Sequence, residues 1–174
     1  MEAIEESIFI GKLHQMRVAV VVAHPDDECL FFGNLISRIK VDLYCCMAAY
    51  QEPQRFNRFF HVCKKVGAKP EVLWFFDMEW LDLKEYDIVF THNHAGEYGH
   101  PKHKLVHNYV ASVHDNVWMN CYGLEEEGVA FDGDDKIDLI KTYDHELSGQ
   151  PRWKSLLNRY GTQFDLKRES YVRV

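Results

Sequence analysis

Residues 17–28 read RVAVVVAHPDDE, a β-branched run followed by a histidine, a proline and three acidic residues. A continuous apolar run of this length is expected of a strand that is covered on both faces of a sheet. Pro25 fixes the turn after the strand, and the acids that follow stand where they favour the start of a helix. The stretch therefore predicts a buried strand that ends in a polar turn.

Outside this stretch, segments with strand character alternate with segments in which apolar residues have helical spacing. The predicted strands are residues 17–23, 41–50, 72–76, 87–92 and 117–122, and the predicted helices are residues 29–40, 54–66, 101–113 and 136–145. The alternation predicts an α/β fold with a mostly parallel sheet and helices on both faces. A chain of 174 residues suits a single domain, residues 1–174.

The composition argues against several classes of protein. The net charge is −7 with neutral histidines, whereas a general nucleic-acid binder carries a basic surface. No apolar run approaches the roughly 20 residues needed to cross a bilayer, and the glutamate-rich start lacks the features of a secretory signal. The five cysteines form no CxxC pair, which favours reduced thiols and a cytoplasmic protein.

Charge is segregated in the last third of the chain. Residues 125–146 contain nine acids and two lysines, whereas residues 151–174 contain six arginines or lysines and two acids. Two solvated faces of opposite sign would explain this pattern. The alternative is that the basic segment docks against the acidic one or against an anionic partner.

Ten histidines are present, and six of them lie between residues 92 and 114. Ligands of an α/β sheet bind beyond the carboxyl ends of its strands, so the polar residues 24–28 and 91–94 are expected at one edge. His100 and His103 are three residues apart where a predicted helix begins, so both can face the same way. Taken alone, residues 24–28 could be a structural turn followed by the acidic start of a helix. Taken alone, His100 and His103 could be exposed histidines of a helix.

Together the two clusters predict a metal site. His24, Asp27 and His103 supply three ligands, and three protein ligands with an open position are typical of a catalytic zinc site. Asp26 is then left as a base, and His100 with Tyr98 as donors toward an oxyanion. Zn²⁺ is the expected metal, although such a ligand set also accepts iron, cobalt or manganese.

The motif AHPDDE followed by GHPxH, over residues 17–114, resembles the LmbE/PIG-L family of zinc-dependent N-deacetylases. The resemblance implies a Rossmann-like α/β fold and hydrolysis of N-acetyl groups, mostly on N-acetylglucosamine-containing substrates. It implies the same three ligands, Asp26 as general base, and His100 as oxyanion donor or as acid for the leaving amine. Tyr98 stands where some members have a tyrosine near the scissile carbonyl. Arg55 resembles in position an arginine that contacts substrate hydroxyls or phosphate, and the alternative is an exposed arginine of the predicted helix.

The chain also departs from the family pattern. Lys102 stands where the family often has aspartate or asparagine, and an ammonium there would lower the pKa of His100. The chain is shorter than many relatives, so the site could be open to a larger substrate or be completed by a second copy in a homo-oligomer. Residues 140–150 resemble the family's later helix, which ends in Ser-x-Gln.

The expected function is removal of an acetyl group from an N-acetylglucosamine-type sugar or sugar conjugate, with Asp26 as the base that acts on a metal-activated water. The partner would be a small-molecule or glycan substrate and not a nucleic acid. Two alternatives stay open: an amidase for a different conjugate, such as a thiol conjugate, and a metal- or sugar-binding relative without activity. A nucleotide-binding module is disfavoured because the sequence has no GxGxxG or P-loop pattern.

Overall fold

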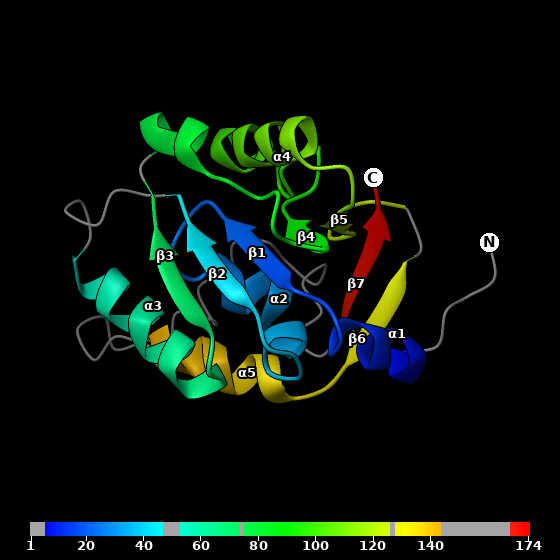
Figure 1. Ribbon diagram of the computed structural model, residues 1–174. Coiled ribbons are helices and arrows are strands. Elements are labelled where there is room, and N and C mark those ends of the chain that lie inside the picture. The colour runs from blue at the N-terminus through cyan, green and yellow to red at the C-terminus, as the bar shows by residue number, and fades with distance from the viewer. Residues whose placement is uncertain (1–5, 47–52, 74, 126–127, 144–167) are drawn as a thin grey trace.

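The computed structural model describes residues 6–46, 53–73, 75–125, 128–143 and 168–174. Within them, seven strands form one sheet in the order β3-β2-β1-β4-β5-β7-β6 (Figure 1). The parallel strands are β1 (Val18–Val22), β2 (Asp42–Cys45), β3 (Lys69–Val72), β4 (Ile88–Thr91) and β5 (Val117–Asn120). The strand β7 (Arg168–Arg173) runs antiparallel to β5 and to β6 (Val129–Asp132). The predicted α/β fold with a mostly parallel sheet is confirmed.

Helices cover both faces of the sheet, as the sequence predicts. One face carries α1 (Glu6–Leu13), α2 (Asp27–Ile36), α3 (Pro53–Val66), α5 (Asp135–Ile140) and the 3₁₀ turn η2 (Lys141–Tyr143). The other face carries α4 (Pro101–Val113) and the 3₁₀ helix η1 (Phe75–Trp80), which lie together above the sheet in Figure 1.

The central strand β1 shows why two covering layers are needed. Val18, Val20 and Val22 contribute to the core that α2 and α3 cover. Ala19 and Val21 contribute to the core beneath α4. Successive side chains of a strand point to opposite faces, so a strand that is apolar at every position is buried only between two layers.

The third strand lies earlier in the chain than predicted. The sequence predicts a strand at residues 72–76, but β3 spans Lys69–Val72 and the 3₁₀ helix η1 begins soon after it. The register explains the difference, because residues 69–72 pair one for one with residues 42–45 of β2. β3 is an edge strand, and Pro70 is tolerated there because one side of an edge strand needs no ladder hydrogen bond.

Other boundaries differ less. The helix predicted at residues 29–40 begins at Asp27 and ends at Ile36. The helix predicted at residues 136–145 begins at Asp135, ends at Ile140 and continues as η2. The elements α1, β6 and β7 were not predicted. Residues 47–50 of the second predicted strand, residues 144–150 with the Ser-x-Gln match, and residues 151–167 of the basic segment lie outside the described part of the chain.

All five cysteines are free and buried, in agreement with the predicted reduced thiols. Burial raises the pKa of Cys46 to about 12, so this thiol stays protonated. Among the described residues, no helix is both long enough and apolar enough to cross a membrane.

Candidate metal and active site

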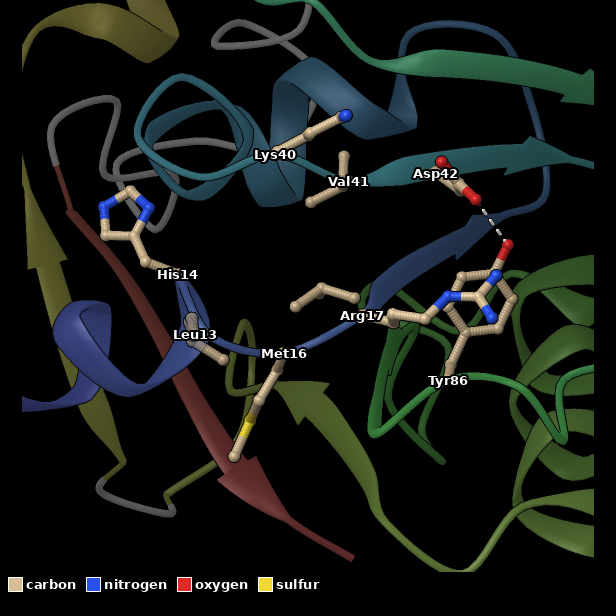
Figure 2. Close-up of a pocket in the computed structure, with 9 residues that line it drawn as sticks. Leu13, His14, Met16, Arg17, Lys40, Val41, Asp42 and Tyr86 are labelled. Carbon is tan, nitrogen blue, oxygen red and sulfur yellow. Dashed lines mark hydrogen bonds between the residues drawn. The ribbon is translucent and has the colours of Figure 1, made fainter.

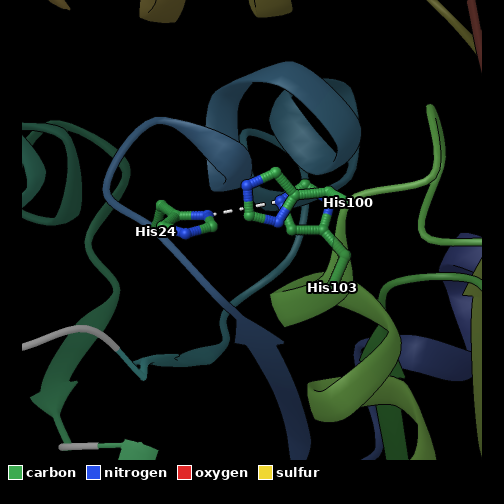
Figure 3. Close-up of side chains that lie close together, drawn as sticks. All are labelled: His24, His100 and His103. Atoms are coloured by element: carbon green, nitrogen blue, oxygen red, sulfur yellow. Dashed lines mark hydrogen bonds between the residues drawn. The ribbon is translucent and has the colours of Figure 1, made fainter.

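Two segments that are far apart in the sequence meet at the carboxyl edge of the sheet. The turn after β1 carries His24, and the start of α4 carries His100 and His103 (Figure 3). The ring centroids of His24 and His100 are 4.7 Å apart, and those of His100 and His103 are 4.5 Å apart. The structure thus brings both sequence motifs into one cluster.

Acidic side chains hold the turn that follows β1. The backbone amide of His24 donates to Asp27 Oδ2 (2.8 Å), and that of Asp26 donates to Glu28 Oε2 (2.8 Å). Asp26, the N-cap of α2, has a φ of 110°, which non-glycine residues rarely adopt. Glu28 is fully buried against the hydroxyl of Tyr143, and burial raises the pKa of this glutamate to about 7. The side chains of Asp27 and Glu28 therefore fix the unusual backbone of the turn.

Three potential ligand atoms face one another at nearly equal distances. Asp27 Oδ2 lies 3.1 Å from His24 Nδ1 and 3.3 Å from His103 Nε2, and the two nitrogens are 3.3 Å apart. Ligands at about 2.0–2.1 Å from a tetrahedral zinc ion lie about 3.3 Å from one another. Two imidazole nitrogens and one carboxylate oxygen are also suitable in type. The residues present therefore fit a divalent metal ion.

Two further histidines adjoin these atoms, but each has a nitrogen engaged elsewhere. His92 Nε2 lies 3.4 Å from Asp27 Oδ2, and it accepts the backbone amide hydrogen of Ala23 at 2.9 Å. His100 Nδ1 accepts the backbone amide hydrogen of Lys102 at 3.3 Å, which leaves Nε2–H of the neutral ring as a donor. Both histidines belong to groups close enough to hold a metal ion. Their hydrogen bonds favour the trio described above as the ligand set.

A loop with left-handed backbone carries the second segment to the cluster. Gly96, Glu97 and Gly99 have φ values of 69°, 55° and 87°. A Cβ atom at position 96 would lie 2.6 Å from the carbonyl oxygen of His100, so glycine is required there. Pro101 occupies the first turn of α4, where it needs no hydrogen-bond donor. The loop and the proline together place His100 at the N-cap of α4.

Sequence reasoning missed Glu97, a buried carboxylate beside the cluster. Its Oε2 lies 2.6 Å from His103 Nδ1 and 3.1 Å from His92 Nδ1. Its Oε1 accepts the backbone amide of Asn93 (3.0 Å) and the side-chain amide of Asn120. His92, Asn93 and Asn120 were not assigned to the site either. The one signal for Glu97 was an acidic residue inside the same GEYGHPKH segment as the histidines.

The carboxylates determine the charge of the cluster. Burial opposes ionisation of Asp27, but the neighbouring histidines, His103 above all, hold its pKa well below its usual range. Burial also opposes the charge of His103, yet Asp27 and Glu97 raise its pKa to about 10. For Glu97, burial is again outweighed, and His92 and His103 lower the pKa to about 2. The two carboxylates therefore favour positive charge on the histidine nitrogens. Either protons or a metal ion can supply this charge, so the two compete for the same nitrogens.

His100 and Tyr98 form the outer part of the cluster. Partial burial and the neighbouring imidazoles of His103 and His24 lower the pKa of His100 to about 4, so this ring is neutral near neutral pH. The direction agrees with the sequence expectation, but its main causes are burial and these rings and not the exposed Lys102. Tyr98 is 39% exposed, and its ring centroid lies 5.4 Å from that of His103.

Arg55 and Asp26 form an ion pair across the site. Nη2 of Arg55, on α3, donates to Asp26 Oδ1 at 2.6 Å, and the two side chains are 13% and 6% exposed. The sequence assigns Arg55 to substrate and Asp26 to catalysis. In the structure the guanidinium contacts the carboxylate of the assigned base.

Two hollows in the described surface differ in their relation to the cluster. The first, of about 180 Å³, is lined by Phe31, Lys136 and Arg168 among others. The Phe31 ring centroid lies 5.8 Å from that of His92 and 5.9 Å from that of His103, so this hollow adjoins the cluster. The second, of about 310 Å³, lies at the amino ends of β1 and β2, on the opposite edge of the sheet (Figure 2).

Fold and cluster together define an α/β protein with a candidate His/Asp metal site. The structure is similar to that of GalB, the 4-carboxy-2-hydroxymuconate hydratase from Pseudomonas putida, with a TM-score of 0.63. The two chains are 13% identical, and the match covers 91% of this chain and 96% of GalB, which shows a shared fold.

One sequence relative is an uncharacterized protein of Acanthamoeba polyphaga mimivirus, 26% identical over a match that covers 50% of this chain. The match covers 53% of the viral protein, so the chain spans about half the length of this curated relative. No family model matches the chain.

Proposed function

We propose that the chain is a metal-dependent hydrolase of the LmbE/PIG-L type. It would remove an acetyl group from an N-acetylglucosamine-type sugar or sugar conjugate. The observation that supports this most is the mutual spacing of 3.1–3.3 Å among donor atoms of His24, Asp27 and His103. These residues lie in the two motifs that resemble the family, and the fold places both motifs at one edge of the sheet.

The three donors would hold one Zn²⁺ ion, with iron, cobalt or manganese as other candidates. When bound, the ion supplies Lewis-acid chemistry to the scissile carbonyl and makes water acidic enough to lose a proton near neutral pH. Three protein donors leave one tetrahedral position open, as in catalytic zinc sites.

Asp26 is the proposed base. Its carboxylate is nearly buried, it belongs to the turn that also carries His24 and Asp27, and Arg55 Nη2 donates to it at 2.6 Å. Asp26 accepts one proton from the attacking water, whose oxygen bonds to the acetamide carbon. The carbon–nitrogen bond then breaks, and the proton held by Asp26 passes to the leaving nitrogen. The second proton of the water stays on the acetic acid product, so atoms and protons balance, and in neutral solution acetic acid and the amine ionise to acetate and an ammonium ion.

His100 is proposed to stabilise the oxyanion that forms during attack. Its Nδ1 is occupied by the amide of Lys102, so the neutral ring presents Nε2–H as the donor. Tyr98, at the exposed rim beside His100, can add a hydroxyl donor (the ring centroids are 5.8 Å apart). In other enzymes the loss of one such donor lowers the turnover rate about 100- to 1,000-fold.

The proposal is tested by measuring acetate and free amine released from N-acetylglucosamine and from larger N-acetyl sugars, with added Zn²⁺ and after chelation. Metal-dependent release in equal amounts is expected. Asp26→Asn and His103→Ala should abolish it, whereas Asp42→Asn, which alters a carboxylate at the opposite edge, should retain it. Normal turnover by Asp26→Asn would contradict the mechanism. Release from a thiol conjugate alone would shift the substrate class, and zinc binding without any release would favour an inactive relative.

A second candidate is hydration of an unsaturated carboxylic acid, in which the same activated water adds to a carbon–carbon double bond. The similarity to the hydratase GalB suggests this reaction. The hollow beside Phe31, which Lys136, Arg168 and Glu169 line among others, adjoins the cluster and is where such a substrate would bind. Water addition to an unsaturated acid by the metal-loaded protein, with no acetate from any N-acetyl sugar, would replace the hydrolase proposal with this one.

A further inference from the structure

Glu97 contacts His103, one of the three proposed ligands, and is not itself one of the three donors. We propose that Glu97 is the positioning residue of this site, whose carboxylate holds His103 with Nε2 turned toward Asp27 and His24. The inference rests on the metal-binding part of the proposed function. It concerns a residue that neither the sequence motifs nor the fold comparison singles out.

The first step concerns the ring of His103. Its Nδ1 lies 2.6 Å from Glu97 Oε2, and its Nε2 lies 3.3 Å from both Asp27 Oδ2 and His24 Nδ1. A carboxylate accepts hydrogen bonds and cannot donate them, so Nδ1 must carry the hydrogen. Nε2 of the neutral ring then keeps its lone pair for a metal ion. Metal-binding histidines commonly have such a carboxylate partner.

The second step concerns His92, the competing candidate ligand. Oε2 of Glu97 also lies 3.1 Å from His92 Nδ1, so the same oxygen sets the tautomer of both rings. Nε2 of His92 is thereby the acceptor for the backbone amide of Ala23 at 2.9 Å. One carboxylate thus exposes the lone pair of His103 and directs that of His92 to the backbone. This explains why His24 and not His92 completes the trio.

The third step concerns how Glu97 itself is held. Oε1 accepts the backbone amide of Asn93 and the side-chain amide of Asn120, while the amide of Glu97 donates to Asn93 Oδ1 at 3.0 Å. The side chain of Glu97 is fully buried, and its backbone has a φ of 55°. Each carboxylate oxygen therefore faces two donors. An amide in its place would turn its NH₂ group toward two of them.

The test measures zinc affinity, by competition with a chromophoric chelator, for the wild-type chain and for Glu97→Gln. We expect the variant to bind Zn²⁺ about 10- to 100-fold more weakly, the usual effect of losing such a carboxylate partner. Glu169→Gln is the matched control, because Glu169 is another buried carboxylate, bonded to the backbone amides of Asn34 and Leu35. This control should bind zinc as the wild type does. Equal affinity of Glu97→Gln and wild type would overturn the proposal.

A second measurement needs no variant and covers the case in which Glu97→Gln does not fold. Ring-nitrogen NMR of the zinc-loaded wild-type chain should show His103 and His92 protonated at Nδ1, with zinc at Nε2 of His103 alone. Zinc at Nδ1 of His103, or at either nitrogen of His92, would overturn the proposal. Failure of the hydrolase proposal is a separate result, because acetate release plays no part in either measurement.

Discussion

The ion pair between Arg55 and Asp26 yields the sharpest prediction of the structure. Nη2 and Oδ1 are 2.6 Å apart, and both side chains are almost buried. Replacing Arg55 with methionine removes the guanidinium but retains a side chain of similar length. The carboxylate of Asp26 then remains at the end of β1 without this cation.

The expected loss in the free energy of unfolding follows from the burial of the ion pair. Removing one partner of a buried ion pair typically destabilises a protein by about 3–5 kcal/mol. Because the side chains of Arg55 and Asp26 keep 13% and 6% exposure, we expect the lower end, about 3 kcal/mol, for Arg55→Met. The double variant with Asp26→Asn removes both charges of the ion pair, so it should recover about 2 kcal/mol relative to the sum of the single effects.

The assay is urea unfolding of the wild type, both single variants and the double variant. Additive effects within about 0.5 kcal/mol would show that the pair is not coupled and would refute this reasoning. Turnover provides a second readout once a substrate is found. A residue that orients the base should lower kcat by about 100-fold when replaced, since misplacement by 1 Å has such effects. If Arg55 binds substrate, as the family resemblance implies, its replacement would raise KM and leave kcat unchanged.

Three further predictions follow from the core and the cluster. Phe32→Ala should lower the free energy of unfolding by about 3–5 kcal/mol in urea, because this ring is fully buried and stacked on Tyr171; a loss below about 1 kcal/mol would be inconsistent. Burial raises the pKa of Glu169 despite Lys136 and Tyr171, so the folded chain holds this proton more tightly and loses stability as pH rises through the folded pKa. The free energy of unfolding of Glu169→Gln should change less with pH over that range than the free energy of unfolding of the wild type. The same change with pH in both proteins would contradict the raised pKa of Glu169. Chelation of the zinc-loaded chain should lower Tm by about 5–10 °C if zinc had been present at about 100 times its Kd, whereas Asp27→Ala should show no shift.

The parts of the fold that the sequence predicts are those with strong local signals. The apolar run at residues 18–22 could only be a strand between two layers, and Pro101 followed by helical spacing marks the start of α4. The edge location of both polar clusters follows from the parallel topology, not from any contact between them. These local signals account for the strands β1, β2, β4 and β5 and for the helices α2, α3, α4 and α5, whereas α1 was not predicted.

The antiparallel strand β7 could not be predicted in the same way. Its inward positions are Glu169 and Tyr171, so the strand lacks the alternating apolar pattern. Glu169 is tolerated inside because it accepts the amides of Asn34 and Leu35 in α2 and faces Lys136 at 3.7 Å. These partners lie more than 30 residues away in sequence and become visible only in the folded chain.

In the candidate site, too, some residues could be predicted from local sequence and others only from the folded structure. His24, Asp27 and His103 stand in motifs whose residue types suit a metal, so the sequence could suggest them. The sequence placed His92 at this edge but gave it no role, and Glu97 was not suggested, because their contacts depend on the left-handed loop that folds Glu97 back between the two rings. Arg55 was suggested by the family resemblance, yet its contact with Asp26 became clear only from the packing of α3 against the turn after β1.

The central claim is that His24, Asp27 and His103 form one divalent metal site. It is tested most directly by counting tightly bound zinc per chain, by equilibrium dialysis and elemental analysis, in the wild type and in Asp27→Ala. The account predicts one zinc ion per wild-type chain and none in the variant, with both chains folded. Equal zinc content in the two chains, or none in the folded wild type, would contradict it.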